Sequence, residues 1–165
     1  MVFGLFFLVF AFERRGETQL FRVSQQWLNR GLGFADTVLL LTSSLWVALA
    51  MRSFKEGEAR RARRWTLGAI ACGLCFILLK GIEYWQKLAQ GITLNTNDFF
   101  VCYFVFTGLH LLHVILGVGV LVYIRAAVTS ALPTPAHTLI EGGSVFWHLV
   151  DVIWVFLFAL LYVAN

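Results

Sequence analysis

Four long runs of apolar residues follow one another along the chain, separated by polar segments. They cover residues 32–51, 65–82, 99–125 and 144–163. A helix needs about 20 mostly apolar residues to cross the hydrocarbon core of a bilayer, so each run predicts a transmembrane helix. The pattern therefore predicts an all-α integral membrane protein, with residues 1–165 forming a single membrane domain.

A fifth apolar run covers residues 1–12, which as a helix would be only ~18 Å long. It lacks the basic start and the cleavage site of a signal peptide. We expect either that residues upstream of Met1 are missing or that this first span is short and protected by a partner. The expected architecture is a bundle of five transmembrane helices, of which the first is short or truncated.

Composition supports the same class of protein. Hydrophobic residues make up 59% of the chain and charged residues 13%, against about 45–50% and about 25% in soluble domains. These values exclude a water-soluble enzyme, a disordered chain and a disulfide scaffold. The formal net charge of +4 does not indicate nucleic-acid binding, because the basic residues lie between apolar runs, where they mark membrane orientation.

The basic residues predict that orientation. The densest group lies in residues 51–64, which we place in the cytoplasm; it consists of Arg52, Lys55, Arg60, Arg61, Arg63 and Arg64. With five spans, the N-terminus is then cytoplasmic and the C-terminus lies outside. The segment 13–31 argues mildly against this orientation, because it carries four arginines and would face the outside.

Aromatic residues favour the two interfaces of a membrane. Trp65 and Trp85 are twenty residues apart, a helical distance of ~30 Å that matches the hydrocarbon core. We expect this helix to run from one tryptophan to the other, with Tyr84 at the far end. The residues expected to contact lipid or the interface are Trp65, Lys80, Tyr84, Trp85, Trp147 and Trp154.

Ionisable residues inside membrane helices are costly and indicate function or specific pairing. With residues 1–12 counted as the first span, His110 and His113 share a face of the fourth span, residues 99–125. His148 and Asp151 share a face of the last span. Haem or metal ligation, proton relay and hydrogen bonding between helices are all compatible with this pattern, and hydrogen bonding is favoured. Asp151 lies ~10 Å inside the last span, and we expect it to pair with His148 or with a histidine of the fourth span.

Two further groups of polar residues are candidates for a site. Glu83 is spaced to pair with Lys80 or Lys87 on the third span. His137 and Glu141 lie four apart in the last loop and would form only an incomplete metal site. Together these considerations predict a network of polar contacts between helices that comprises Glu83, His110, His113, His148 and Asp151.

Small residues predict where helices approach one another closely. The third span has a stripe made of Gly68, Ala71, Cys72 and Cys75. The second span has the pair Ser44 and Ala48, and the fourth span carries Gly108, Gly117 and Gly119. The pair Cys72 and Cys75 has no second pair with which to form a metal site, so we interpret these cysteines as small packing residues.

Several segments of the chain resemble subunit III of the haem–copper oxidases. Asp36 stands where that family usually has asparagine, and the segment 107–114, with its two histidines, is the most specific match. The match extends over nearly the whole chain, through the segments 36–44, 81–84, 99–100, 107–114, 137–141 and 147–154. The segments 21–25 and 28–30 look most like the short five-span branch associated with bacterial nitric oxide reductases.

The resemblance implies an accessory subunit without catalytic residues, haem or metal of its own, in the cytoplasmic membrane of a bacterium. Its expected partners are membrane lipids, with bound phospholipid as a ligand, and a large haem-bearing catalytic subunit of nitric oxide reductase. Subunit III of a terminal aerobic oxidase is the alternative. The signature residues carried over, His110, His113, His137 and His148, are not metal ligands in this family.

Two other classes of protein remain open from the residues alone. A haem-carrying b-type electron-transfer subunit would need histidines on two helices that face one cavity. An independent membrane transporter would be active when reconstituted alone. The absence of an inverted repeat in the sequence argues against the transporter.

Overall fold

The structure, a computed structural model, describes residues 30–91, 98–128 and 135–163. These residues form four long helices: α3 (Arg30–Lys55), α4 (Ala59–Ala89), α5 (Asp98–Ala127) and α6 (Pro135–Phe158). A short π-helix, η1 (Ala159–Val163), ends the last of them. All four long helices are long and apolar enough to cross a membrane. The all-α class is therefore confirmed, whereas the expected first span at residues 1–12 lies outside the described residues.

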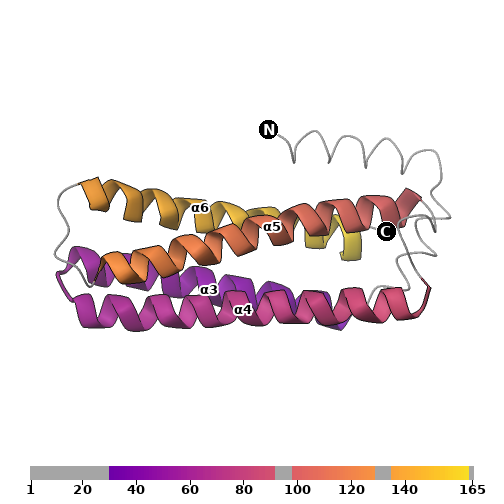
Figure 1. Cartoon of the computed structure of the whole chain (residues 1–165), viewed down its shortest axis with the longest axis horizontal. Helices are drawn as coiled ribbons and strands as arrows, with labels where there is room; N and C mark the ends of the chain where they lie inside the picture. The colour runs from indigo at the N-terminus through magenta and orange to yellow at the C-terminus, as the bar shows by residue number, and fades with distance from the viewer. Residues whose placement is uncertain (1–29, 92–97, 129–134, 164–165) are drawn as a thin grey trace.

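The four helices lie side by side as an elongated antiparallel bundle (Figure 1). Contacts join α3 to α4, α4 to α5, α5 to α6, and α6 back to α3, so the ring of helices closes around one core. Each helix buries residues at intervals of three or four; on α3 these include Asp36, Leu40, Ser43, Val47 and Ala50. This spacing gives each helix one face toward the core and leaves the rest of its surface for the membrane.

The helices are longer than the apolar runs that predict them. α4 begins at Ala59, six residues before Trp65, because its arginine-rich first turns can remain helical outside the hydrocarbon core. α6 begins at Pro135 rather than near residue 144, because a proline fits the first turn of a helix, where its missing N–H is not needed. His137 and Glu141 therefore lie on α6 and not in a loop, which corrects the expectation. The chain reverses between α3 and α4 at Gly57, whose φ of 77° suits glycine.

Trp147 is the largest side chain at the centre of the core. Its indole fills the space left by two glycines, Gly73 of α4 and Gly117 of α5. A methyl group on either glycine would come within 2.9 Å or 2.7 Å of a ring atom of Trp147. Trp147 is 0% exposed and Trp154 1% exposed, so the expectation that they contact lipid is wrong: both lie on the inward face of α6.

The expected stripe of small residues on α4 is only partly correct. Gly68 lies directly beneath the ring of Trp46 from α3, whereas Ala71 and Cys75 are exposed. The helix turns this part of the stripe outward because the buried positions 69, 73 and 76 lie on the opposite face. Gly117 contacts Trp147 as described, while Gly119 faces open space.

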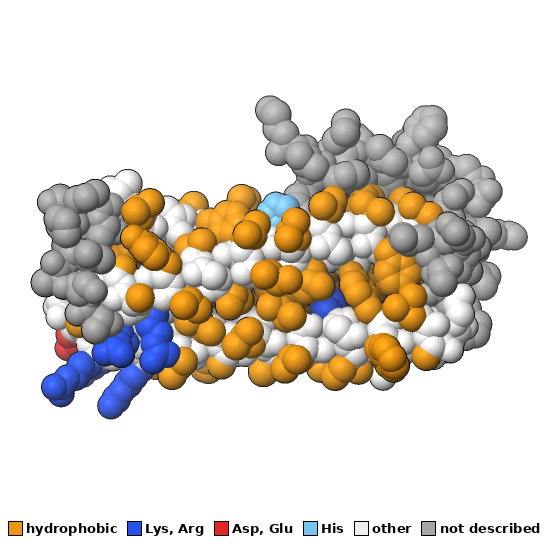
Figure 2. All heavy atoms as spheres, viewed as in Figure 1, with side chains coloured by type: hydrophobic (Ala, Val, Ile, Leu, Met, Phe, Trp, Pro, Cys, Tyr) orange, Lys and Arg blue, Asp and Glu red, His pale blue; other side chains and the backbone are white. Residues whose placement is uncertain are grey.

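On the face shown in Figure 2, apolar side chains extend along most of the length of the bundle, and lysine and arginine side chains gather at one end. That end is formed by the last turn of α3 and the first turns of α4. Trp65 is 37% exposed and Trp85 75% exposed. Their placement on the outer surface suits the interfacial positions that the sequence predicts for them.

Candidate functional site

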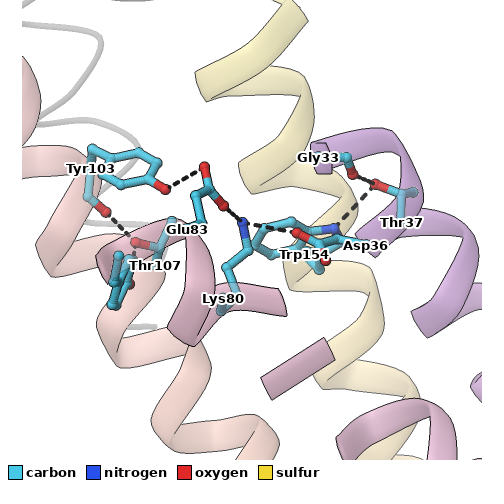
Figure 3. A network of polar contacts seen from close by, with 9 residues as sticks. Gly33, Asp36, Thr37, Lys80, Glu83, Tyr103, Thr107 and Trp154 are labelled. Carbon is cyan, nitrogen blue, oxygen red and sulfur yellow. Dashed lines mark hydrogen bonds and ion pairs between the residues drawn. The ribbon is translucent and has the colours of Figure 1, made fainter. Parts of the chain in front are cut away.

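A network of buried polar side chains joins α3, α4 and α5 (Figure 3). It lies in the half of the bundle away from the basic end. Its centre is Lys80 of α4, which is 1% exposed. The Lys80 Nζ atom lies 2.9 Å from Asp36 Oδ2 of α3 and 2.5 Å from Glu83 Oε2 of α4. The Tyr103 hydroxyl of α5 donates a hydrogen bond to the other Glu83 oxygen at 2.9 Å. The expectation that Lys80 contacts lipid is therefore wrong, because its ammonium is held between two carboxylates.

Aromatic rings and hydroxyl groups surround these charges. The Lys80 ammonium lies 4.6 Å from the ring centroid of Trp154 on α6, which is close enough for a favourable cation–π interaction. The Trp154 indole N–H donates to the Thr37 hydroxyl at 3.1 Å, and Thr37 donates in turn to the carbonyl of Gly33 at 2.8 Å. The network thus connects α3, α4, α5 and α6.

A second pair of side chains lies beside the network. Thr107 donates a hydrogen bond to the carbonyl of Tyr103, so its oxygen accepts from the Tyr84 hydroxyl at 2.6 Å. Tyr84 is half-buried, and its hydroxyl points to α5 rather than only toward the interface. The contact ties the end of α4 to the first half of α5.

The charges of the network balance one another. The carboxylates of Asp36 and Glu83 are balanced by two ammonium groups. Lys80 contacts both carboxylates, and buried Lys87, one turn further along α4, interacts electrostatically with Glu83. Isolated charges inside a membrane are costly, and pairing with hydrogen bonding reduces that cost. This arrangement holds helices in one register, and it leaves no unbalanced charge among these four groups.

The histidines of α5 lie in different surroundings. His110 is 0% exposed, and its ring packs 5.1 Å from Trp154 and 5.7 Å from Phe76, centroid to centroid. Neither ring nitrogen of His110 has a hydrogen-bond partner among the described residues. The Nδ1 atom of His113 lies 2.7 Å from the carbonyl oxygen of Leu109 on the same helix.

The polar residues of α6 face α3. His148 Nδ1 lies 2.6 Å from the Ser44 hydroxyl oxygen. Asp151 is 3% exposed, and neither of its oxygens has a hydrogen-bond partner among the described residues. The expected pairing of Asp151 with a histidine is therefore not seen, because His148 pairs with the Ser44 hydroxyl instead.

At the basic end, Glu141 Oε1 pairs with Lys55 Nζ of α3 at 3.0 Å. This ion pair lies at the rim of an open groove between α3 and α6, about 660 Å³ in volume, which His148 also lines. The side chain of His137 lies outside the described part of the structure. Within that part, no cluster of three or more His, Cys, Asp or Glu residues is arranged to hold a metal ion.

Sequence reasoning missed four partners of these residues. They are Asp36, which pairs with Lys80, Ser44, which contacts His148, Tyr103, which donates to Glu83, and Thr107, which accepts from Tyr84. A signal for Asp36 was present, because Asp36 and Lys80 lie at similar helical distances before and after the turn at Gly57. Residues so placed face each other across an antiparallel helical hairpin.

The comparisons with known proteins identify the family. The sequence model described as "Cytochrome c oxidase subunit III" matches residues 26–165. The chain belongs to the cytochrome c oxidase subunit III family. The homologues in this family are named as subunit III of cytochrome c oxidase, a non-catalytic accessory subunit of the oxidase complex. The resemblance noted in the sequence is thereby confirmed at the level of the family.

Individual relatives of the chain are named as oxidase subunits. Cytochrome c oxidase subunit 3 of Thermostichus vulcanus is 32% identical over 79% of the chain and 64% of its own length. A probable cytochrome c oxidase subunit 3 of Mycobacterium leprae is also 32% identical, over 76% and 63%. That of Podospora anserina is 31% identical over 96% and 62%. The chain thus spans somewhat less than two thirds of these relatives, whose names support the oxidase alternative better than nitric oxide reductase.

Proposed function

We propose that the chain is an accessory subunit of a terminal haem–copper oxidase and that it packs against the large haem-bearing catalytic subunit. The observation that carries the proposal is the family match over residues 26–165. The relatives named above are subunits of cytochrome c oxidase, and this supports oxygen rather than nitric oxide as the substrate of the partner. The chain contributes no haem and no metal of its own to the reaction.

The physical role follows from the surface and the core. Large apolar side chains on all four helices face outward, among them Leu45, Leu78, Leu116 and Phe156. These side chains form an outer surface that can contact lipid or another membrane subunit. The closed ring of helices and the buried ion network give this surface a fixed shape. The bundle covers and stiffens the lipid-facing side of the catalytic subunit.

Two features argue against the rival classes of protein. A b-type haem would need histidines from two helices that face one cavity. His148 instead contacts Ser44, His113 contacts its own helix, and His110 is packed against aromatic rings. The described residues also show four continuous α-helices with no broken helix before η1, whereas transporters commonly bind substrate at interrupted helices.

Copurification tests the proposal. The chain carries a C-terminal tag, host membranes are extracted in a mild detergent, and the purified material is identified by mass spectrometry and by its haem spectrum. We expect a large haem-bearing subunit in fixed proportion, with the sequence of an oxidase. A chain that is purified alone, intact and monodisperse would refute the proposal. A reductase as the partner would refute the oxidase assignment and leave the accessory role intact.

A control variant separates specific association from shared detergent micelles. Lys80→Met breaks the buried ion network and should lower the yield of the complex, because the bundle loses its fixed shape. Lys55→Met removes only an exposed ion pair, in which the Lys55 side chain is 65% exposed. It should leave the yield near that of the unaltered chain. Equal losses for both variants would show that the buried network does not shape the interface.

A further inference from the structure

Asp151 combines deep burial with the lack of a charged partner among the described residues. It is 3% exposed, and the described residues provide no hydrogen bond to either carboxyl oxygen. An ionised carboxylate without a partner is very costly in a medium of low polarity, and such a group keeps its proton instead. Asp36 and Glu83, by contrast, face the Lys80 ammonium. Asp151 is therefore the buried acid of the described bundle that is expected to be neutral.

A short series of polar groups leads from Asp151 toward water. The Ser44 hydroxyl of α3 lies beside the Asp151 carboxyl and 2.6 Å from His148 Nδ1. His148 is half-buried and lines the 660 Å³ groove between α3 and α6. The groove extends to the basic end, where the ion-paired Lys55 and Glu141 are among its lining residues. Asp151 lies ten residues beyond Glu141 along α6, a helical distance of ~15 Å.

We infer that Asp151 is a proton-binding site that exchanges its proton with the aqueous side at the basic end, through Ser44, His148 and this groove. The Asp151 carboxyl gives its proton to the Ser44 oxygen while Ser44 gives its own proton to His148 Nδ1. The products are a carboxylate and an imidazolium, so charge and protons balance. When the half-buried ring turns Nδ1 toward the groove, the proton passes to water. The reverse steps return a proton to Asp151.

Charged groups near this path lie at its mouth and not at Asp151. Ser44 is the polar group of α3 beside Asp151. The helix α5, which also packs against α6, carries His110 and His113. The charged residues that line the mouth are Arg52, Lys55, Glu56 and Glu141. The ion pairs Arg52–Glu56 and Lys55–Glu141 balance one another's charge there. Charged side chains thus line the mouth, while Asp151 at the other end of the path is buried.

Infrared spectroscopy tests the inference on the full chain, extracted with the subunits that accompany it and reconstituted in lipid. A protonated carboxyl gives a carbonyl-stretching band that shifts when its proton is exchanged for deuterium. We expect one such band that disappears in Asp151→Asn. If that variant does not fold, carboxyl-¹³C aspartate in the unaltered chain should shift the same band. A band that neither change affects would overturn the assignment.

The rate of exchange tests the path. Ser44→Ala and His148→Phe should each slow deuterium exchange of the Asp151 band by about tenfold or more, equivalent to ~1.4 kcal/mol on the barrier. Thr42→Ala is the matched control, because the Thr42 hydroxyl is exposed on the same helix and bonds only within it, to the carbonyl of Val38. Exchange as fast in both variants as in the control would overturn the path and leave Asp151 a structural carboxyl. The outcome does not depend on which oxidase or reductase is the partner.

Discussion

Replacing Lys80 by methionine removes the positive charge from the centre of the ion network at nearly constant side-chain volume. The change leaves two carboxylates, Asp36 and Glu83, that are 1% and 4% exposed. Breaking a buried ion pair by removing one partner costs about 3–5 kcal/mol, because the remaining charge is buried without compensation. Lys80 contacts two carboxylates, at 2.9 Å and 2.5 Å. We therefore expect a loss of at least ~3 kcal/mol in the free energy of unfolding.

Two further variants serve as controls for the loss of the Lys80 charge. Lys55→Met breaks another ion pair between helices, but that pair is 65% and 56% exposed, and exposed pairs contribute only about 0–1 kcal/mol. Adding Asp36→Asn to Lys80→Met removes the carboxylate that loses its ion-pair partner, whereas Glu83 still interacts with Lys87. The double variant should therefore be more stable than Lys80→Met alone, although it carries one more substitution.

The assay is equilibrium unfolding in mixed micelles of a mild detergent and dodecyl sulfate, followed by tryptophan fluorescence. Trp154 is a suitable reporter, because its ring lies 4.6 Å from the Lys80 ammonium. A loss for Lys80→Met no larger than that for Lys55→Met would refute the assignment of Lys80 as a buried, doubly paired cation. A double variant less stable than Lys80→Met would show that Asp36 stabilises the bundle by some other contact.

Two further predictions concern packing and hydrogen bonding. Gly117→Ala should destabilise the bundle by about 1–3 kcal/mol, because the added methyl group would lie 2.7 Å from the buried indole of Trp147. Gly119→Ala, whose methyl group meets nothing within 4 Å, should be neutral or slightly stabilising in the same unfolding assay. Equal effects of the two variants would contradict the close packing of Gly117 against Trp147. Tyr103→Phe should cost about 1–3 kcal/mol, because Glu83 loses the hydrogen bond that its Oε1 atom accepts at 2.9 Å. Tyr123→Phe, at a position 51% exposed, is its control, and a loss of the same size there would show that the buried hydrogen bond is not the cause.

The apolar runs predict the four described helices because crossing a membrane imposes a length and a composition on each helix. Their ends were harder to predict. The first turns of α4 continue beyond the hydrocarbon core although they carry four arginines, and α6 starts at Pro135, nine residues before the apolar run at 144–163. Helix ends depend on local hydrogen bonding and on the surroundings outside the membrane, which hydropathy does not measure.

The candidate site was predicted only in part. Glu83 and His148 each contact a side chain of another helix, whereas His113 contacts its own helix and Asp151 has no hydrogen bond among the described residues. Trp147, Trp154 and Lys80 were expected at the surface and are buried. Tryptophan favours both interfaces and cores, so residue type alone does not decide between them. The rotation of each helix about its axis decides, and that rotation is set by the neighbouring helices.

The sequence by itself determined the class of protein, the family and the positions of the apolar spans, because these follow from composition and from motifs along one chain. Only the tertiary structure decided which polar residues meet. Asp36 and Lys80 are far apart in sequence, yet they form an ion pair at 2.9 Å because α3 and α4 fold back on each other. Asp151 remains without a hydrogen-bond partner among the described residues because His148 contacts Ser44 of the facing helix. Pairing between helices depends on register and rotation, and these arise only when all four helices pack together.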